Sequence, residues 1–117
     1  MGLVSNLDKV ARRIYNINMQ NLELPQPLQF EWDSGNQNKN LRKHGVTNDE
    51  AEEVFINLNL IWADIKHSGI EQRFNILGKS NNGKLIFSCY TLRDNKIRII
   101  SSRPASRKER NAYEKTL

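Results

Sequence analysis

Apolar residues near the start of the chain recur at alternating three- and four-residue steps. This spacing predicts an amphipathic helix within residues 1–18, with a buried stripe of Leu3, Leu7, Val10, Ile14 and Ile17. Two prolines in residues 24–27 enforce an extended linker. We therefore expect a helix and linker over residues 1–27 and one folded domain over residues 28–117. The helix would pack on its own domain or on a partner chain, unless Met19 is the start and the helix an extension.

The next segment predicts a short strand and two helices. Residues 30–32 alternate apolar and polar side chains, as a strand does. A short polar helix is expected over residues 36–44, closed by Gly45. Thr47 and Glu50 have the spacing of a capping box, which opens a second helix. The predicted buried face of that second helix comprises Ala51, Val54, Phe55 and Leu58.

After residue 58 the hydrophobic period becomes two, which predicts strands. Four strands are expected, over residues 60–66, 72–79, 84–93 and 96–103. The last two breaks between them are rich in Asn, Asp and Gly, which is typical of hairpins, so the strands should form an antiparallel meander. Ser106 and Glu109 form a second capping box at the start of a terminal helix. The pattern predicts an α+β domain: a four-stranded antiparallel sheet plus a short N-terminal strand, with helices before and after.

Composition narrows the class of protein. With 117 residues, 38% hydrophobic and 26% charged, the chain has the make-up of a single soluble globular domain. No apolar run approaches the roughly 18 residues of a membrane helix, and the N-terminus lacks the features of a signal peptide. Cys89 is the only cysteine. It can form no internal disulfide, so a cytoplasmic location is expected, and its mid-strand position predicts a buried packing role.

The net charge of +5 arises entirely from residues 93–115, which carry eight basic and three acidic residues. Clustered cations favour a polyanionic partner, because neutralised phosphates release counterions. A solvated basic face without a ligand explains the same pattern. The cations expected to contact RNA are Arg93, Lys96, Arg107, Lys108 and Arg110.

The sequence contains no recognisable metal or nucleotide motif. His44 and His67 lie far apart, without carboxylates at ligand spacing, and neither Cys-x-x-Cys nor His-Glu-x-x-His occurs. A phosphate-binding glycine loop and a serine-hydrolase elbow are also missing. We therefore expect no metal and no other cofactor.

The remaining candidate chemistry is RNA cleavage by cations and a histidine. Without a metal, the 2′-hydroxyl attacks the adjacent phosphate, which requires a base, an acid and cations that stabilise the transition state. Histidine can serve as an acid or a base near neutral pH, and His44 shares a predicted helix face with Asn40 and Lys43. The alternative is a solvent-facing helix whose basic end complements the helix dipole.

Arginines on the predicted strands are candidates for binding phosphate. Arg98 lies between two isoleucines, so it either binds an anion on an open face or forms a salt bridge with Glu71 or Glu31. Arg73 and Arg103 lie at strand ends. Their planar guanidinium groups suit two phosphate oxygens at once.

Short motifs occur in a fixed order along both halves of the chain. The first half contains Phe30-x-Trp32-Asp33, Asn40-x-x-Lys43-His44-Gly45-Val46 and Ala51-x-x-Val54-Phe55. The second half contains Glu71-x-Arg73, Gly78, Tyr90-Thr91-x-Arg93, Arg98-Ile99-Ile100-Ser101, Arg103-x-Ala105 and Glu109-Arg110-x-x-Tyr113. In combination they resemble the BrnT toxin family over about residues 29–114, although each motif alone is weak.

This resemblance implies a RelE-like endoribonuclease toxin of a type II toxin–antitoxin system, which cleaves RNA and inhibits translation and growth. It implies a BrnA-type antitoxin as protein partner, with operator DNA bound only through the antitoxin, and is compatible with a toxin homodimer within a heterotetramer. It places these residues at the active surface: Lys43, His44, Arg73, Tyr90, Arg98 and Arg103. His44 would be the acid or base and the three arginines would hold the phosphate, while Trp32 and Phe55 would hold the core.

Two positions depart from the family pattern. Many relatives carry a lysine where this chain has Asn36, so Lys39 in the next turn is a candidate substitute. Ser102 replaces a usual alanine. The competing hypothesis is a non-catalytic module whose basic surface binds nucleic acid or an acidic partner.

Overall fold

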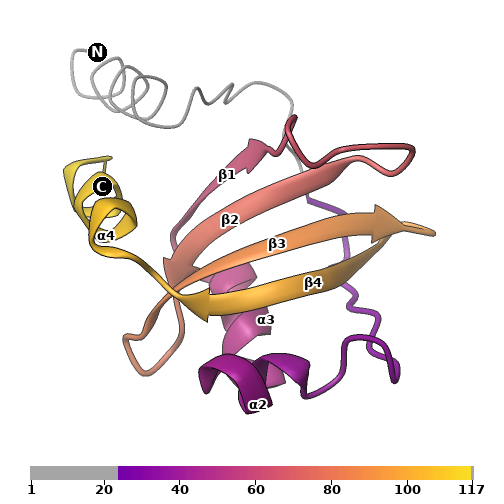
Figure 1. Ribbon diagram of the computed structural model, residues 1–117, viewed down its shortest axis with the longest axis horizontal. Helices are drawn as coiled ribbons and strands as arrows, with labels where there is room; N and C mark the ends of the chain where they lie inside the picture. Colours follow the sequence, from indigo (N-terminus) through magenta and orange to yellow (C-terminus); the bar gives the residue numbers. More distant parts are fainter. Residues whose placement is uncertain (1–23, 117) are drawn as a thin grey trace.

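The computed structural model describes residues 24–116, so the predicted N-terminal helix lies outside the described residues. Within the described residues, two short helices, four strands and a terminal helix follow one another (Figure 1). The helices are α2 (Lys39–His44), α3 (Asn48–Ile56) and α4 (Arg107–Thr116). The strands are β1 (Asn59–Ala63), β2 (Arg73–Lys79), β3 (Leu85–Arg93) and β4 (Lys96–Pro104). No helix in the described range is long and apolar enough to cross a membrane.

The four strands form one antiparallel sheet in the order β1-β2-β3-β4, which confirms the predicted meander. The turn between β2 and β3 contains Gly83 at φ 84°, and the turn between β3 and β4 has Asp94 and Asn95 at φ 53° and 60°. These left-handed conformations suit Gly, Asn and Asp, which is why the two hairpins could be read from the sequence. The β3–β4 pairing shifts register between Cys89 and Tyr90.

The predicted N-terminal strand is reduced to a single parallel bridge between Phe30 and Ile97 of β4. After this bridge the chain turns away from the sheet. The Trp32 indole Nε1 donates to Glu52 Oε2 at 2.6 Å, which directs this residue towards α3. In the turn that follows, the Asp33 carbonyl accepts hydrogen bonds from the backbone amides of Asn36 and Gln37.

The helix signals are confirmed in part. Gly45 closes α2 at φ 71°, and the Thr47 hydroxyl and Glu50 carboxylate form the complete capping box that opens α3. Helix α2 begins at Lys39 instead of at residue 36, because a turn occupies the preceding residues. Leu58 was predicted to be buried but is 66% exposed, because α3 already ends at Ile56.

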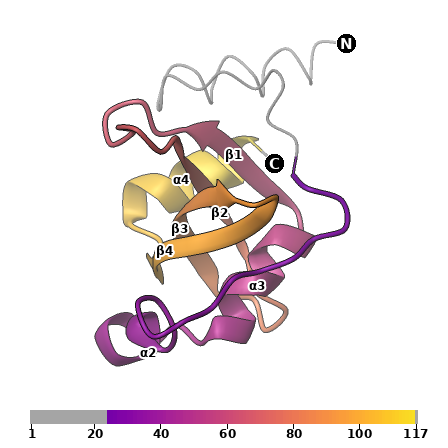
Figure 2. The ribbon, with the colours of Figure 1, turned by 90° about the vertical axis from the view of Figure 1, so that its right-hand side faces the viewer.

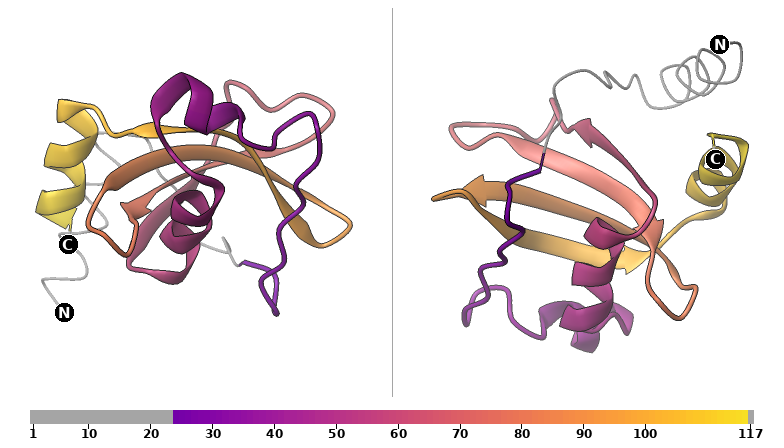
Figure 3. Two further views of the ribbon diagram at one scale, coloured as in Figure 1. Left: turned by 90° about the horizontal axis from the view of Figure 1, so that it is seen from below. Right: turned by 180° about the vertical axis from the view of Figure 1, so that it is seen from behind.

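The sheet separates two apolar clusters. On one face, α3 contributes Val54 and Phe55 to a core with Ile76 and Ile99. On the other face, α4 packs Tyr113 against the end of the sheet, in a cluster with Leu60, Trp62, Leu77 and Leu85. Figures 2 and 3 show α3 and α4 on opposite faces of the twisted sheet. Among the described residues, α4 covers only one end of its face, and the rest of that face is open.

The outer edge of β4 is covered by the chain segment that precedes it. Glu31 and Ile97 are joined by a backbone hydrogen bond of 2.8 Å. Further along, the backbone amide of Ser102 donates to Asn40 Oδ1 at 2.9 Å, and Lys39 Nζ donates to the Ile100 carbonyl at 3.0 Å. Side chains of α2 therefore satisfy part of an edge that would otherwise expose unpaired backbone groups.

Candidate active site

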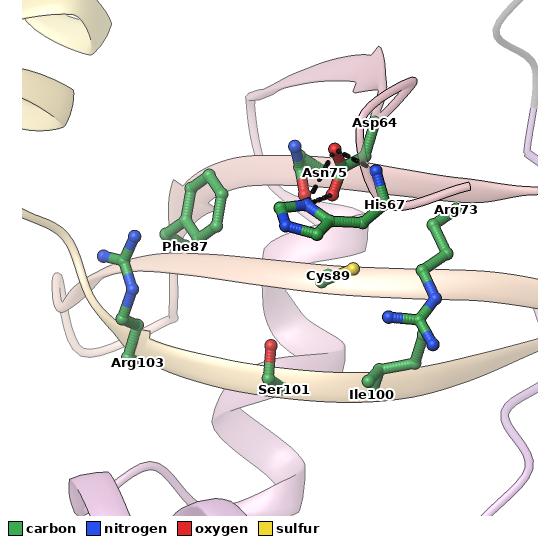
Figure 4. Close-up of a pocket in the computed structure, with 9 residues that line it drawn as sticks. All are labelled: Asp64, His67, Arg73, Asn75, Phe87, Cys89, Ile100, Ser101 and Arg103. Atoms are coloured by element: carbon green, nitrogen blue, oxygen red, sulfur yellow. Dashed lines mark hydrogen bonds and ion pairs between the residues drawn. The ribbon is translucent and has the colours of Figure 1, made fainter. Parts of the chain in front are cut away.

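A hollow with a volume of about 380 Å³ lies on the open part of the sheet face that α4 covers in part. Its walls come from β2, β3 and β4, from Asp64 directly after β1, and from His67 in the β1–β2 loop (Figure 4). The lining side chains belong to Asp64, His67, Arg73, Asn75, Phe87, Cys89, Ile100, Ser101 and Arg103. Of the arginines predicted to bind phosphate, Arg73 and Arg103 line this hollow.

His67 is held over the hollow by Asp64. Its Nδ1 lies 3.0 Å from Asp64 Oδ2, and its backbone amide lies 3.4 Å from Oδ1 of the same carboxylate. The side chain of His67 is 60% exposed and that of Asp64 is 14% exposed. A carboxylate bonded to one ring nitrogen fixes the tautomer and orientation of a histidine, which leaves the other nitrogen for proton transfer.

The loop that carries this pair is closed by a serine. Ser68 Oγ donates to the Asp64 carbonyl at 2.7 Å and accepts a hydrogen bond of 2.9 Å from the Arg73 amide. One hydroxyl therefore links the residue that orients His67 to the first residue of β2. A second anchor follows, because the Thr91 hydroxyl donates to the Gln72 carbonyl at 2.7 Å.

The two arginines of the hollow differ in their partners. Both terminal nitrogens of Arg103 donate to Glu109 at 2.8 Å, and its guanidinium lies 4.4 Å from the centre of the Phe87 ring. By contrast, the Arg73 guanidinium makes no hydrogen bond or ion pair with any residue in the described part of the chain. Of the two arginines that line the hollow, Arg73 is therefore the one whose hydrogen-bond donors are available for an anion.

Cys89 is half-buried and lines the hollow, so it is less enclosed than the predicted buried packing residue. The strand places it opposite Asn75 and Ser101 on the open face. Burial raises the pKa of the Cys89 thiol, and the nearby Asp64 carboxylate adds to this effect. The thiol therefore remains protonated at neutral pH, which disfavours a nucleophilic role.

Arg98 forms the salt bridge that was one of its two expected roles. It pairs with Glu31 at 3.2 Å and, through both terminal nitrogens, with Asp33 at 2.7 and 3.1 Å. Hydrogen bonding to Arg98 lowers the pKa of Asp33, and the same pairing raises the pKa of Arg98. The other expected partner, Glu71, pairs instead with Arg93 at 3.2 Å.

Tyr90 is placed in the core, on the sheet face opposite the hollow. It is 2% exposed and its ring contacts those of Phe55 and Phe74. Burial raises its pKa well above the usual value for tyrosine. The family resemblance had placed Tyr90 on one active surface with Arg73 and Arg103. The structure instead separates Tyr90 from these two arginines.

The α2 candidates lie outside the hollow. Lys43 and His44 are exposed at the C-terminal end of α2, whereas Asn40 is buried against β4. Asn36, where the resemblance led us to expect a lysine, is buried and donates to the carbonyls of Glu31 and Ile99. Asn36 is therefore a structural residue in this chain.

Cations from the basic part of the chain are distributed over several surfaces. Arg93, Arg98 and Arg103 all pair with carboxylates, so the charge count overstates the positive charge that is free for RNA. Arg107, Lys108 and Arg110 are exposed on α4, and Lys96 is exposed at the start of β4. None of these four lines the hollow.

Reasoning from the sequence missed the pair formed by His67 and Asp64. The available signal was the Asp64-x-x-His67 spacing in a turn, where a carboxylate can reach a ring three residues later. Among the described residues, no group of three or more His, Cys, Asp or Glu side chains lies close enough to hold a metal ion.

Comparison with known families agrees with the motifs. No curated protein matches the chain. Residues 32–109, about two thirds of the chain, match the family model described as ribonuclease toxin, BrnT, of type II toxin–antitoxin system. This range includes both α2 and α3, the whole sheet and the first turn of α4. The chain therefore belongs to the BrnT family of ribonuclease toxins.

Proposed function

We propose that the hollow is the site at which this toxin cleaves RNA, with His67 as the base and Arg73 as the main phosphate ligand. The observation that carries this proposal is the placement of an unpaired guanidinium and a carboxylate-oriented histidine around one open hollow. This arrangement supplies the two elements that RNA cleavage by the 2′-hydroxyl requires, a proton acceptor and a cation at the phosphate.

The proposed reaction proceeds without a metal ion. The free ring nitrogen of His67 takes the proton from the 2′-hydroxyl, whose oxygen attacks the adjacent phosphorus. The bond from phosphorus to the 5′ oxygen breaks, and this oxygen takes a proton from water in the open hollow. The products are a 2′,3′-cyclic phosphate and a 5′-hydroxyl. Arg73 stabilises the charge that develops on the phosphate oxygens, and Arg103 adds a weaker field because Glu109 balances its charge.

The other expected site residues enter this proposal differently. Lys43 and His44, exposed on α2, are candidates for contacting RNA beyond the scissile phosphate, as are the exposed cations of α4. Arg98 and Tyr90 support the sheet through their ion pairs and ring contacts. We further propose that a BrnA-type antitoxin restrains the toxin.

The test is cleavage of a single-stranded RNA by purified protein freed of antitoxin, in the presence of a metal chelator. His67→Ala should reduce kcat about 10²–10⁴-fold, and Arg73→Ala about 10²–10³-fold. Arg42→Ala removes an exposed guanidinium on α2 and should leave cleavage unchanged. A matching RNA with 2′-deoxy sugars should remain intact.

Three results would contradict the proposal. Loss of cleavage in the chelator would show that a metal is required. Loss in His44→Ala together with full activity in His67→Ala would move the site to α2. If the unmodified protein binds RNA without cutting it and does not arrest growth, the chain is the non-catalytic binding module.

A further inference from the structure

Asn75 lies in the centre of the sheet, and its amide has no hydrogen-bond partner among the residues that the structure describes. It is 9% exposed and lines the hollow among the side chains shown in Figure 4. Across the sheet it is in register with Trp62 on β1 and Cys89 on β3. Within the described residues, no hydrogen bond involves the Asn75 side chain.

Two other asparagines in the described part of the chain use their amide nitrogens structurally, whereas that of Asn40 is buried without a partner. Asn36 donates to two backbone carbonyls, and Asn59 donates to the carbonyls of Val54 and Asn57 at 3.0 and 2.9 Å. The Asn75 amide is not among the fully buried polar groups that lack a partner in the described part of the chain, so its polar atoms face the open hollow. An asparagine in the centre of a sheet that turns its amide into a hollow is available to hydrogen-bond a ligand bound there.

We propose that Asn75 reads the edge of one nucleobase of the RNA and so determines the base preference beside the cleaved bond. A carboxamide presents one acceptor and two donors, which match the adjacent donor and acceptor on a base edge. Unstacked bases of single-stranded RNA are recognised by such edge contacts.

The surroundings of Asn75 fit a base next to a phosphate. Arg73 lies two residues away on the same strand and the same face, where it can hold the neighbouring phosphate. Phe87 and Ile100 give the hollow apolar walls, and Ser101 adds a hydroxyl. A base in this hollow would bring the amide of Asn75 its missing hydrogen bonds.

This inference rests on the proposed cleavage site, and its test separates the two. Cleavage sites in a random-sequence single-stranded RNA are mapped for the unmodified protein, Asn75→Leu and Asn75→Asp. We expect a preference for one base at a fixed position, which both variants reduce between about five- and a hundredfold. The same preference should appear in the binding of 2′-deoxy oligonucleotides, which cannot be cleaved.

Two controls distinguish base reading from a structural role. Asn75→Leu removes an unpaired amide and should not lower Tm, because it breaks no hydrogen bond. Asn59→Leu breaks three backbone hydrogen bonds, so it should lower Tm and leave the base preference unchanged.

The possible outcomes are distinct. If the unmodified protein cuts RNA but has no base preference, or if both Asn75 variants retain it, the inference fails while the cleavage site stands. The same conclusion holds if the variants weaken only antitoxin binding, which would make the antitoxin the partner of the amide. If the unmodified protein cuts no RNA, the proposed function fails, and the binding preference alone decides the role of Asn75.

Discussion

Arg103 and Glu109 are joined by two hydrogen bonds of 2.8 Å, which fasten the end of β4 to the first turn of α4. The Glu109 carboxylate also accepts a hydrogen bond of 2.8 Å from the Ser106 amide in the capping box. One buried carboxylate thus fixes the angle at which α4 leaves the sheet. The same carboxylate holds the Arg103 guanidinium at one side of the hollow.

This pair predicts a pH dependence of stability. Burial alone would raise the pKa of Glu109, but the hydrogen bonds from Arg103 and Ser106 outweigh it and lower the pKa. A lowered pKa in the folded protein stabilises the fold above the ordinary glutamate pKa of about 4.3, and the contribution is lost as pH falls below that value. Glu109→Gln should cost about 1–2 kcal/mol at neutral pH. Urea unfolding of both proteins at several pH values measures this, and an equal acid sensitivity would contradict it.

Arg98 and Arg73 should show opposite phenotypes. Arg98→Met removes the ion pairs with Glu31 and Asp33, so it should lower Tm while kcat per folded molecule is retained. Arg73→Met breaks no ion pair among the described residues and should retain Tm while kcat falls. Thermal unfolding and RNA cleavage on the same preparations make the comparison. Loss of kcat in well-folded Arg98→Met would restore the catalytic role expected from the sequence.

Ser68 should act as a positioning residue for His67 and Arg73. Ser68→Ala removes the hydroxyl that bridges Asp64 and Arg73, and a displacement of about 1 Å in a catalytic group can cost a hundredfold in rate. We expect kcat to fall about ten- to a hundredfold with KM nearly unchanged. Ser68→Thr retains the hydroxyl and should restore the rate. Steady-state kinetics of RNA cleavage measure this effect. An unchanged kcat in Ser68→Ala would show that the loop keeps its conformation without this hydroxyl.

Gly78 should tolerate no side chain. A Cβ there would lie 3.0 Å from the Asn59 Cβ, 3.1 Å from the Leu58 carbonyl oxygen and 3.1 Å from Val54 Cγ1. Gly78→Ala should therefore destabilise the protein by about 1–3 kcal/mol. At Gly69 a Cβ would meet nothing within 4 Å, so Gly69→Ala is the matched control and should be neutral. Chemical denaturation measures both, and equal stabilities would contradict the prediction.

Elements with local chemical signals could be predicted from the sequence. The Thr47–Glu50 capping box, the glycine that closes α2 and the Asn- and Gly-rich hairpin turns depend on residues close together in the chain. The strand ends were correct to within about three residues, because the alternation of apolar side chains stops where each turn begins.

The candidate site depended on information that periodicity does not contain. Both faces of the sheet are partly covered, so apolar residues on β3 do not reveal which face Tyr90 occupies. The pairing of Arg98 with Asp33 could not be predicted from local charge, because these two residues lie 65 positions apart in the chain. The Asp64-x-x-His67 spacing signals a contact between the two side chains, but it does not reveal that this pair borders the same hollow as Arg73.

The contacts that α2 makes with the edge of β4 also affect how readily the protein aggregates. Asn40 and Lys39 hold backbone groups of β4 that could otherwise recruit a strand from another molecule. Fraying of α2, a helix of six residues, would free that edge while the rest of the sheet is still formed. Local unfolding of α2 would therefore expose unpaired backbone groups of β4 that can pair with another molecule. We expect mild heating to cause concentration-dependent aggregation before the sheet itself unfolds.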